Sequence, residues 1–336
     1  MSPLVSICTP IYNVSKYMER CARSLFEQTY SNIEYVFVDD GSPDDSIAIL
    51  KQVATDYSRV VPQIRIIRHS HNRGLAAARN TAVEAAQGEF IVHVDSDDWV
   101  EPDMIECLVR QQLETQADIV SCNAIAHYAN RTVVLEEPDY DSKDAMMRHI
   151  IQMSLDHVIW RRLIRTSLYR DNNISTYEGI NIGEDHYTLP RLLFYAKSFE
   201  KCNKSLYHYN CMNKNSYTQV SKHFFNKERY YNDRDSVNIL YDFFMIHDDR
   251  YIPELLAVKT HFIYMNFFQV VKLGEKEMYK VLCDDWRNIP VEVKLEEGIP
   301  RYRILLLGNS YYYINRFRVW MRVLLKKVFK IEKYYL

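Results

Sequence analysis

The sequence GEFIVHVDSDDWV, residues 88–100, joins an apolar strand pattern to a dense acidic cluster. Its strand-like residues, 90–94, run directly into the cluster DSDD at 95–98. Carboxylates this close repel one another, and the repulsion costs most where water is scarce. A chain that places them at the end of a buried strand is expected to hold a positive charge there.

The chain on both sides of this stretch alternates strand and helix patterns up to about residue 125. Strand patterns occur at 4–9, 33–40, 63–69, 89–95 and 117–122, and helical patterns at 15–28, 43–57, 74–86 and 102–114. Strands that alternate with helices of about 10–15 residues predict a parallel sheet covered on both faces. In such sheets, ligands bind beyond the carboxyl ends of the strands.

Three polar clusters fall at these predicted strand ends. They are TPIYN (9–13), VDDGS (38–42) and the DSDD cluster (95–98). Because parallel strands end at the same edge of a sheet, we expect the three clusters to share one crevice.

The acidic cluster does not fit an EF-hand calcium loop. Counted from Asp95, such a loop needs an oxygen ligand at the fifth position and a glycine at the sixth, where this chain has Trp99 and Val100. A second interpretation stays open: Asp97 or Asp98 caps the helix that begins near Pro102.

The first predicted strand lacks the glycine-rich turn that binds phosphate through backbone amides. The first glycine of the chain is Gly41, which excludes a dinucleotide fingerprint after that strand and argues against a sugar nucleotidyltransferase. The remaining candidate is a site that meets a diphosphate through a divalent cation. Carboxylates at Asp-x-Asp spacing offer the hard oxygen ligands that suit Mn²⁺ or Mg²⁺.

Composition and pattern predict a soluble protein with two parts. Hydrophobic residues make up 47% and charged residues 26%, and no apolar run approaches the length of a membrane span. The seven cysteines form no Cys-x-x-Cys pair, which fits a reducing cytosol. We expect a catalytic unit over 1–220, with a nucleotide-binding half at about 1–125 and an acceptor half at about 126–220, followed by a helical region over 221–336.

Six motifs in order make the sequence resemble the family 2 nucleotide-sugar glycosyltransferases of the GT-A fold, over residues 3–220. The motifs are VSICTPIYN (5–13), SLFEQTYSNIEYVFVDDGSPDDS (24–46), NRGLAAARN (72–80), GEFIVHVDSDDWV (88–100), VIWRRLIRTSL (158–168) and GEDHYTLPRLL (183–193). The resemblance implies an α/β fold with a mainly parallel sheet flanked by helices, plus a C-terminal helical region. It also points to bacterial polysaccharide assembly.

The resemblance assigns nucleotide-binding roles to residues at the strand ends. Thr9, Pro10 and Tyr12 would frame the base, and Asp40 would accept hydrogen bonds from the uracil edge. Arg73 would reach the nucleotide or the diphosphate, Asp95 the ribose or the metal-bound region, and Asp97 would be the principal metal ligand, with Asp98 behind it. Alternatives from the residues alone are an Asx-type turn at DDGS and a solvated Arg73. Arg79 and Asn80 are expected to support the crevice.

The resemblance also implies an inverting transfer. Asp185 would be the general base for the acceptor hydroxyl, with Glu184 beside it at the acceptor or donor sugar. The alternative is that both acids only favour a helix N-terminus after Gly183. Trp160 and His208 are further candidates for contacts with the donor sugar or the acceptor, and a core tryptophan is the alternative for Trp160.

Together these features predict a metal-dependent hexosyl- or N-acetylhexosaminyltransferase. Its donor would be a nucleotide sugar, most simply a UDP-sugar, its acceptor a glycan or lipid-linked glycan, and its cofactor Mn²⁺ or Mg²⁺; no nucleic acid is expected as a partner. The alternatives are a sugar nucleotidyltransferase and a non-catalytic module that binds a sugar nucleotide.

The last segment carries a concentrated positive charge. Residues 301–336 hold nine basic and one acidic residue. On a helical wheel over 316–333, one arc is apolar and the opposite side basic; the apolar arc contains Phe317, Trp320, Met321, Leu324, Leu325, Val328 and Ile331. We expect residues 311–336 to form an amphipathic helix that docks the protein on the anionic, cytoplasmic face of the cell membrane. A helix packed on its own protein is the alternative.

Overall fold

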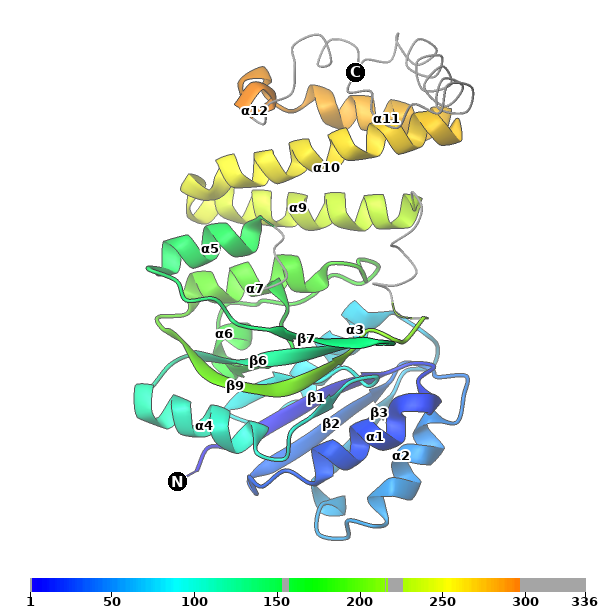
Figure 1. Cartoon of the computed structure of the whole chain (residues 1–336), viewed down its shortest axis with the longest axis vertical. Coiled ribbons are helices and arrows are strands. Elements are labelled where there is room, and N and C mark those ends of the chain that lie inside the picture. The colour runs from blue at the N-terminus through cyan, green and yellow to red at the C-terminus, as the bar shows by residue number, and fades with distance from the viewer. Residues whose placement is uncertain (1, 153–156, 215, 217–225, 297–336) are drawn as a thin grey trace. The chain divides into compact units, whose positions relative to one another are not determined.

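The computed structural model describes residues 2–152, 157–214, 216 and 226–296 (Figure 1). By its internal contacts the chain divides into two compact units, Met1–Val220 and Ser221–Leu336, here called unit 1 and unit 2. Each unit has a hydrophobic core of its own.

The first half of the sheet in unit 1 is parallel. Its strands, in the spatial order β3-β2-β1-β4, are β1 (Val5–Ile11), β2 (Ile33–Asp39), β3 (Ile64–Arg68) and β4 (Phe90–His93). The connecting helices are α1 (Ser15–Phe26), α2 (Ser46–Ala54), the short 3-10 helix η1 (Val61–Gln63) and α3 (Leu75–Ala85). Helices α1 and α2 lie on one face of these strands and α3 on the other (Figure 1).

The second half of the sheet is mixed. Its strands are β5 (Trp99–Val100), β6 (Ile119–Tyr128), β7 (Arg131–Leu135), β8 (Arg162–Arg165) and β9 (Phe199–Asn210). Strand β8 runs antiparallel between β4 and β6, and β9 runs parallel to β6 but antiparallel to β5. Parallel pairings still predominate over the sheet as a whole, as the strand–helix alternation predicted, and the antiparallel pairings are those made by β8, β5 and β7. A strand from beyond the alternating region separates β4 from β6, and local patterns do not report such an insertion.

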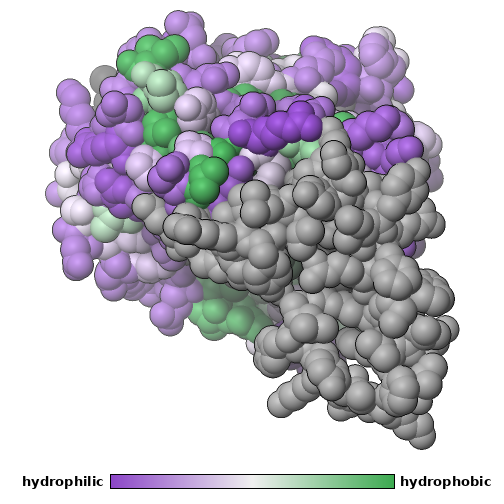
Figure 2. All heavy atoms as spheres, turned by 90° about the horizontal axis from the view of Figure 1, so that it is seen from above, coloured by the Kyte–Doolittle hydropathy of each residue, from purple (hydrophilic) through white to green (hydrophobic). Residues whose placement is uncertain are grey.

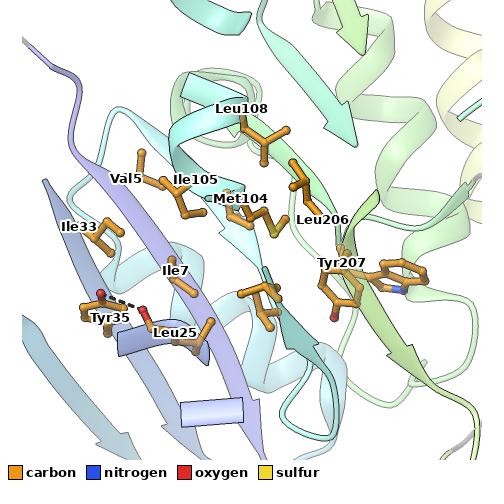
Figure 3. Packing of buried hydrophobic residues seen from close by; sticks show 14 of the residues in the cluster. Val5, Ile7, Leu25, Ile33, Tyr35, Met104, Ile105, Leu108, Leu206 and Tyr207 are labelled. Atoms are coloured by element: carbon orange, nitrogen blue, oxygen red, sulfur yellow. Dashed lines mark hydrogen bonds between the residues drawn. The ribbon is translucent and has the colours of Figure 1, made fainter. Parts of the chain in front are cut away.

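The core of unit 1 packs between the strands and the helices on one face. Val5 and Ile7 of β1 lie among side chains of α1 and α4 (Met104–Thr115), including Leu25, Met104 and Leu108 (Figure 3). The hydroxyl of Tyr35 on β2 donates a hydrogen bond to the carbonyl of Leu25 (3.1 Å), which satisfies its polar end inside this core.

Three further helices complete the described part of unit 1: α5 (Lys143–Ile151), α6 (Thr166–Arg170) and α7 (Glu184–Tyr195). Helix α7 follows Gly183, whose φ of 80° lies in the left-handed region that favours glycine. Glu184 and Asp185 occupy the first turn, where the exposed amide groups of a helix favour negative charge.

Unit 2 is helical over its described residues. Its elements are α9 (Lys227–His247), the 3-10 helix η3 (Asp249–Tyr251), α10 (Ile252–Leu273), α11 (Lys276–Arg287) and α12 (Val291–Glu296). Helix α10 packs against α9, α11 and α12 (Figure 1). On the coloured part of the face in Figure 2, hydrophobic residues form small separate patches among hydrophilic ones.

Within the described ranges, no helix is long and apolar enough to cross a membrane. The predicted amphipathic helix at 311–336 lies outside the described residues.

Candidate functional site

The three polar clusters predicted to share a crevice follow neighbouring parallel strands. Strand β1 ends at Ile11, which pairs with Asp39 at the end of β2, and β4 ends two residues before Asp95. Because β1, β2 and β4 run in the same direction, their carboxyl ends lie at one edge of the sheet. The topology therefore brings the clusters to the same side of unit 1.

Thr9 and Pro10 lie inside β1 rather than after it, which corrects the predicted strand end. They pair with Phe37 and Val38 of β2 and are buried. The hydroxyl of Thr9 has no hydrogen-bond partner within the described residues. Tyr12 follows the strand and is 43% exposed, so it is the one of the three base-framing candidates that presents a large surface.

Asp40 is buried and organises the turn before α3. Its Oδ1 accepts hydrogen bonds from the backbone N–H of Arg73 (2.9 Å) and faces His69 Nδ1 at 2.6 Å, while Oδ2 accepts from the N–H of Gly74 (2.8 Å). Gly74 has a φ of 92°, and a Cβ there would meet the Asn181 side chain at 2.4 Å. The predicted contact between Asp40 and a nucleotide base stays a prediction, and the structure adds a local role for this residue.

Arg73 forms a two-pronged ion pair at the surface. Its Nε and Nη2 donate to the two carboxylate oxygens of Glu178, at 3.1 and 2.9 Å. The two side chains are 38% and 53% exposed.

The acidic cluster places Asp95 and Asp97 in different surroundings. Asp95 Oδ1 accepts from Nη2 of Arg79 at 3.0 Å, and Asp97 Oδ2 accepts from Nδ2 of Asn213 at 2.8 Å. Burial, together with the nearby Asp95 carboxylate, raises the pKa of Asp97 to about 6. A bound cation at this position would favour the ionised form and reverse that shift.

Asp98 serves to anchor the acidic loop. It is fully buried, and it accepts hydrogen bonds from the hydroxyl of Tyr207 and the N–H of Asn210, both at 2.7 Å, on β9. The capping interpretation is wrong for both candidates, because α4 begins at Met104 after Asp103 and no side chain caps it.

The first turn of α7 turns its two acids inward. Glu184 and Asp185 are 5% and 8% exposed. Burial and the adjacent Asp185 carboxylate raise the pKa of Glu184 to about 8. Burial also raises the pKa of Asp185, and Arg79 opposes that rise.

Arg79 joins the acids of α7 to the acidic loop. From α3, its Nε donates to Glu184 (3.2 Å), while Nη2 contacts Asp95 at 3.0 Å and Asp185 at 3.9 Å. The side chain is 2% exposed. Burial disfavours the charge of Arg79, but the three carboxylates together raise its pKa above the usual range. The arrangement is a largely buried charge cluster of one guanidinium and three carboxyl groups.

Trp160 lies behind the acidic loop. It is 7% exposed, and its ring stacks on Tyr207 and Tyr209 at centroid distances of 4.6 and 5.3 Å. Little of the ring remains accessible to a sugar, and Trp160 supports the tyrosine that binds Asp98.

His208 belongs to a separate group of side chains. Its Nε2 lies 2.7 Å from Oε1 of Glu101, its Nδ1 lies 2.9 Å from Nε2 of His127, and its ring stacks on Trp99. Within the described residues, the ion pairs of Arg79 are with Asp95, Glu184 and Asp185, and they do not include His208. Its predicted contact with donor or acceptor stays a prediction.

Comparison with known families decides the classification. The family model described as glycosyl transferase family 2 matches residues 6–177, which is more than half of the chain. The chain belongs to glycosyltransferase family 2. The predicted family is confirmed.

Similar bacterial sequences carry glycosyltransferase names. EpsJ of Bacillus subtilis, an uncharacterized glycosyltransferase, is 34% identical over 230 residues, which cover 66% of this chain and 64% of that protein. The chondroitin synthase of Escherichia coli is 44% identical over 107 residues, covering 32% of this chain and 15% of the synthase. The matched part of the chain therefore spans less than two thirds of the length of each of these relatives.

A crystal structure shows the same fold. Staphylococcus aureus TarS, solved in complex with UDP-GlcNAc, matches with a TM-score of 0.69 at 21% identity, over 99% of this chain and 93% of that chain. At this identity the likeness establishes the fold alone, and the predicted GT-A fold is confirmed.

The buried cluster itself escaped the sequence-based prediction. Arg79 was expected only to support the crevice, yet it contacts both Asp95 of the acidic loop and Glu184 at the start of α7. A signal was present: Arg79 stands among Ala76, Ala78 and Ala82, on the buried face of α3. A charged side chain among small buried residues needs partners of opposite charge.

Proposed function

We propose that the protein is an inverting, metal-dependent glycosyltransferase that moves a sugar from a nucleotide-diphosphate donor to a glycan or lipid-linked acceptor. The observation that carries the proposal is the cluster around Arg79. It joins Asp95, on the loop proposed to bind the donor, to Asp185, the proposed base. Donor binding and acceptor activation would then occur side by side.

Asp95 and Asp97 are the proposed metal ligands. Each has one carboxylate oxygen engaged by Arg79 or Asn213, so the second oxygen of each is the candidate ligand. The described residues contain no group of three or more acidic, histidine or cysteine side chains arranged for a metal, and the diphosphate would supply further oxygens. A bound Mn²⁺ or Mg²⁺ would neutralise charge on the departing nucleoside diphosphate. The fold neighbour from Pyrobaculum calidifontis, solved with GDP-Man and Mn²⁺ at a TM-score of 0.54, supports this choice.

Asp185 is the proposed general base. It would take the proton of the acceptor hydroxyl as that oxygen attacks the sugar from the face opposite the leaving group, which inverts the anomeric carbon. One oxygen of Asp185, Oδ1, is buried and makes no hydrogen bond within the described residues; its ion-pair contact with Nη2 of Arg79, at 3.9 Å, is longer than a hydrogen bond. Buried polar atoms rarely stay unpaired unless a ligand or water completes them.

A UDP-sugar is the proposed donor and surface polysaccharide the proposed context. The structure of TarS with UDP-GlcNAc and the similarity to bacterial chondroitin synthase support both. Thr9, Pro10, Tyr12, Asp40 and Arg73 remain the proposed nucleotide contacts. Family membership disfavours the nucleotidyltransferase alternative.

Peripheral attachment to the inner face of the membrane is proposed from sequence alone, because 311–336 lie outside the described residues. A variant truncated after residue 300 should keep turnover with soluble donors and lose co-sedimentation with anionic vesicles at low salt. Equal co-sedimentation of both proteins, or none by the full chain, would contradict attachment through this segment.

The test of the proposed function is a panel of nucleotide sugars. Thermal shift with Mn²⁺ should select a UDP-sugar, and release of UDP should then depend on a lipid-linked glycan acceptor. Binding without turnover under any acceptor would favour the non-catalytic module, and release of pyrophosphate would favour the nucleotidyltransferase. EDTA should abolish the release of UDP.

A further inference from the structure

Arg79 connects two segments that are far apart in the sequence. Asp95 follows β4, whereas Glu184 and Asp185 begin α7, and all three carboxylates meet one guanidinium from α3. The nitrogen atoms of this guanidinium divide the contacts: Nη2 contacts Asp95 and Asp185, and Nε contacts Glu184. A planar guanidinium fixes the direction of such contacts in a way that a lysine ammonium does not.

The charge cluster depends on Arg79 for its geometry. Within the described residues, the cluster's carboxylates have no second arginine or lysine within ion-pair distance. Like charges in a buried site repel strongly when the opposite charge is removed. Without Arg79, Asp95 and the acids of α7 would move apart or take up protons.

We propose that Arg79 is a positioning residue that holds Asp185, the proposed base, in fixed register with Asp95 on the donor-binding loop. The inference rests on the proposed function. Arg79 would touch neither the sugar nor the acceptor, and it would act through the two aspartates. The register matters because a displacement of about 1 Å between a base and its substrate can cost ~100-fold in rate.

Arg191 offers a matched control within the same unit. It lies on α7 and is 5% exposed, but its guanidinium donates to the backbone carbonyls of Tyr187 (2.6 Å) and Ser175 (2.7 Å). Arg79 and Arg191 are thus both buried arginines, and they differ in their partners. Replacing Arg191 reports the cost of disturbing a buried arginine without touching the acids.

The experiment compares full-length Arg79→Lys with Arg191→Lys. For Arg79→Lys we expect kcat to fall ~100-fold, with a smaller change in the acceptor KM. The gain in UDP affinity caused by Mn²⁺, measured by calorimetry, should shrink about tenfold because Asp95 loses its orienting partner. Arg191→Lys should leave that gain unchanged, whatever its melting temperature. If the two variants change kcat and the Mn²⁺ effect alike, Arg79 has no positioning role.

A second substitution at the same position separates positioning from charge balance. Arg79→Met removes both the charge and the planar geometry of the guanidinium, whereas Arg79→Lys keeps the charge alone. We expect Arg79→Met to have the lower melting temperature, because it leaves Asp95 and Asp185 without a counter-charge, while kcat falls ~100-fold or more in both variants. A kcat that Arg79→Lys keeps and Arg79→Met loses would show that Arg79 only balances charge.

Failure of the proposed function would be visible separately. A wild type that binds UDP with Mn²⁺ but never releases UDP from a donor would contradict the proposed transfer reaction. The effect of Mn²⁺ on the UDP affinity of the Arg79 variants would still test whether Arg79 positions Asp95. A wild type whose UDP affinity is indifferent to Mn²⁺ would overturn both.

Discussion

Arg73 and Arg79 are six residues apart in the sequence, and their guanidinium groups form ion pairs in opposite surroundings, one exposed and one buried. Arg73, in the turn before α3, pairs with Glu178 at the surface and is 38% exposed. Arg79, on α3, is 2% exposed and faces three carboxylates. Water screens the first pair and weakens it, whereas removing one partner of a buried pair leaves an uncompensated charge. Burial, rather than the number of ion pairs, decides which arginine matters more to the protein.

The largest effect is expected on the buried side of this comparison, from Asp185→Asn. The change removes the proposed base and keeps the size of the side chain, so transfer should fall at least ~1000-fold. Donor affinity should stay nearly unchanged, because the base acts on the acceptor. Titration of UDP followed by single-turnover kinetics would measure both. A matching collapse of donor affinity would mean that Asp185 supports the fold of the site.

Asp97→Asn should have the next largest effect. The variant keeps the shape of a ligand that already binds Asn213 but loses its charge, and we expect turnover to fall ~100-fold. The Mn²⁺ requirement should rise in parallel, which a metal titration of kcat measures. Full turnover in this variant, or in wild type treated with EDTA, would contradict the metal site.

Glu184→Gln tests the buried cluster through the pH dependence of protein stability. Because the pKa of Glu184 rises from 4.5 to about 8 on folding, the folded chain keeps a proton that the unfolded chain has released. The wild type should therefore lose stability as pH rises from about 5 to 8, and the variant should lose less. At pH 8 the free energy of unfolding of the variant should exceed that of the wild type by about 1 kcal/mol or more.

Chemical denaturation at pH 5, 6.5 and 8 measures this difference. Glu178→Gln is the matched control, because Glu178 is exposed and Arg73 lowers its pKa. Between pH 6.5 and 8, Glu178→Gln should change neither the free energy of unfolding nor its slope with pH. A wild type whose stability is flat over this range would show that Glu184 is ionised throughout.

The smallest effect is expected at the surface pair. If Arg73 contacts the diphosphate, Glu178 competes with the donor for it, and Glu178→Gln should tighten UDP binding. The gain should stay below about fivefold, because exposed ion pairs contribute little. Arg73→Gln should weaken UDP binding by a similar factor, with the melting temperature unchanged in both variants. Calorimetry that finds UDP affinity insensitive to both changes would remove Arg73 from the nucleotide site.

Local patterns predicted the parallel strands, the acidic loop and the acids at the start of α7. Each of these rests on residues close in the sequence: apolar runs, an Asp-x-Asp, or a glycine followed by two acids. The antiparallel insertion of β8, the anchoring of Asp98 by Tyr207 and the joining of Asp95 to Glu184 by Arg79 depend on segments about 70 to 110 residues apart. Which segments meet is a property of the packed core, and spacing along the chain does not encode it directly.

Thr9 and Trp160 show the same limit for single residues. Their types suit a nucleotide or sugar site, but burial in β1 and stacking on two tyrosines decide how much of each side chain a ligand could reach. Residue type narrows the chemistry, and accessibility comes only with the fold.

The seven cysteines are all buried, so the rate at which each thiol is labelled can report how often the structure around it opens. Burial raises the pKa of Cys8 above its usual range and that of Cys283 to about 12, so neither thiol should react quickly with an alkylating reagent in the native state. Cys8 lies in β1 of unit 1 and Cys283 in α11 of unit 2. Their labelling rates under native conditions would therefore report the opening free energy of each unit separately. A nucleotide that binds at the strand ends would slow the labelling of Cys8 and leave the labelling rate of Cys283 unchanged.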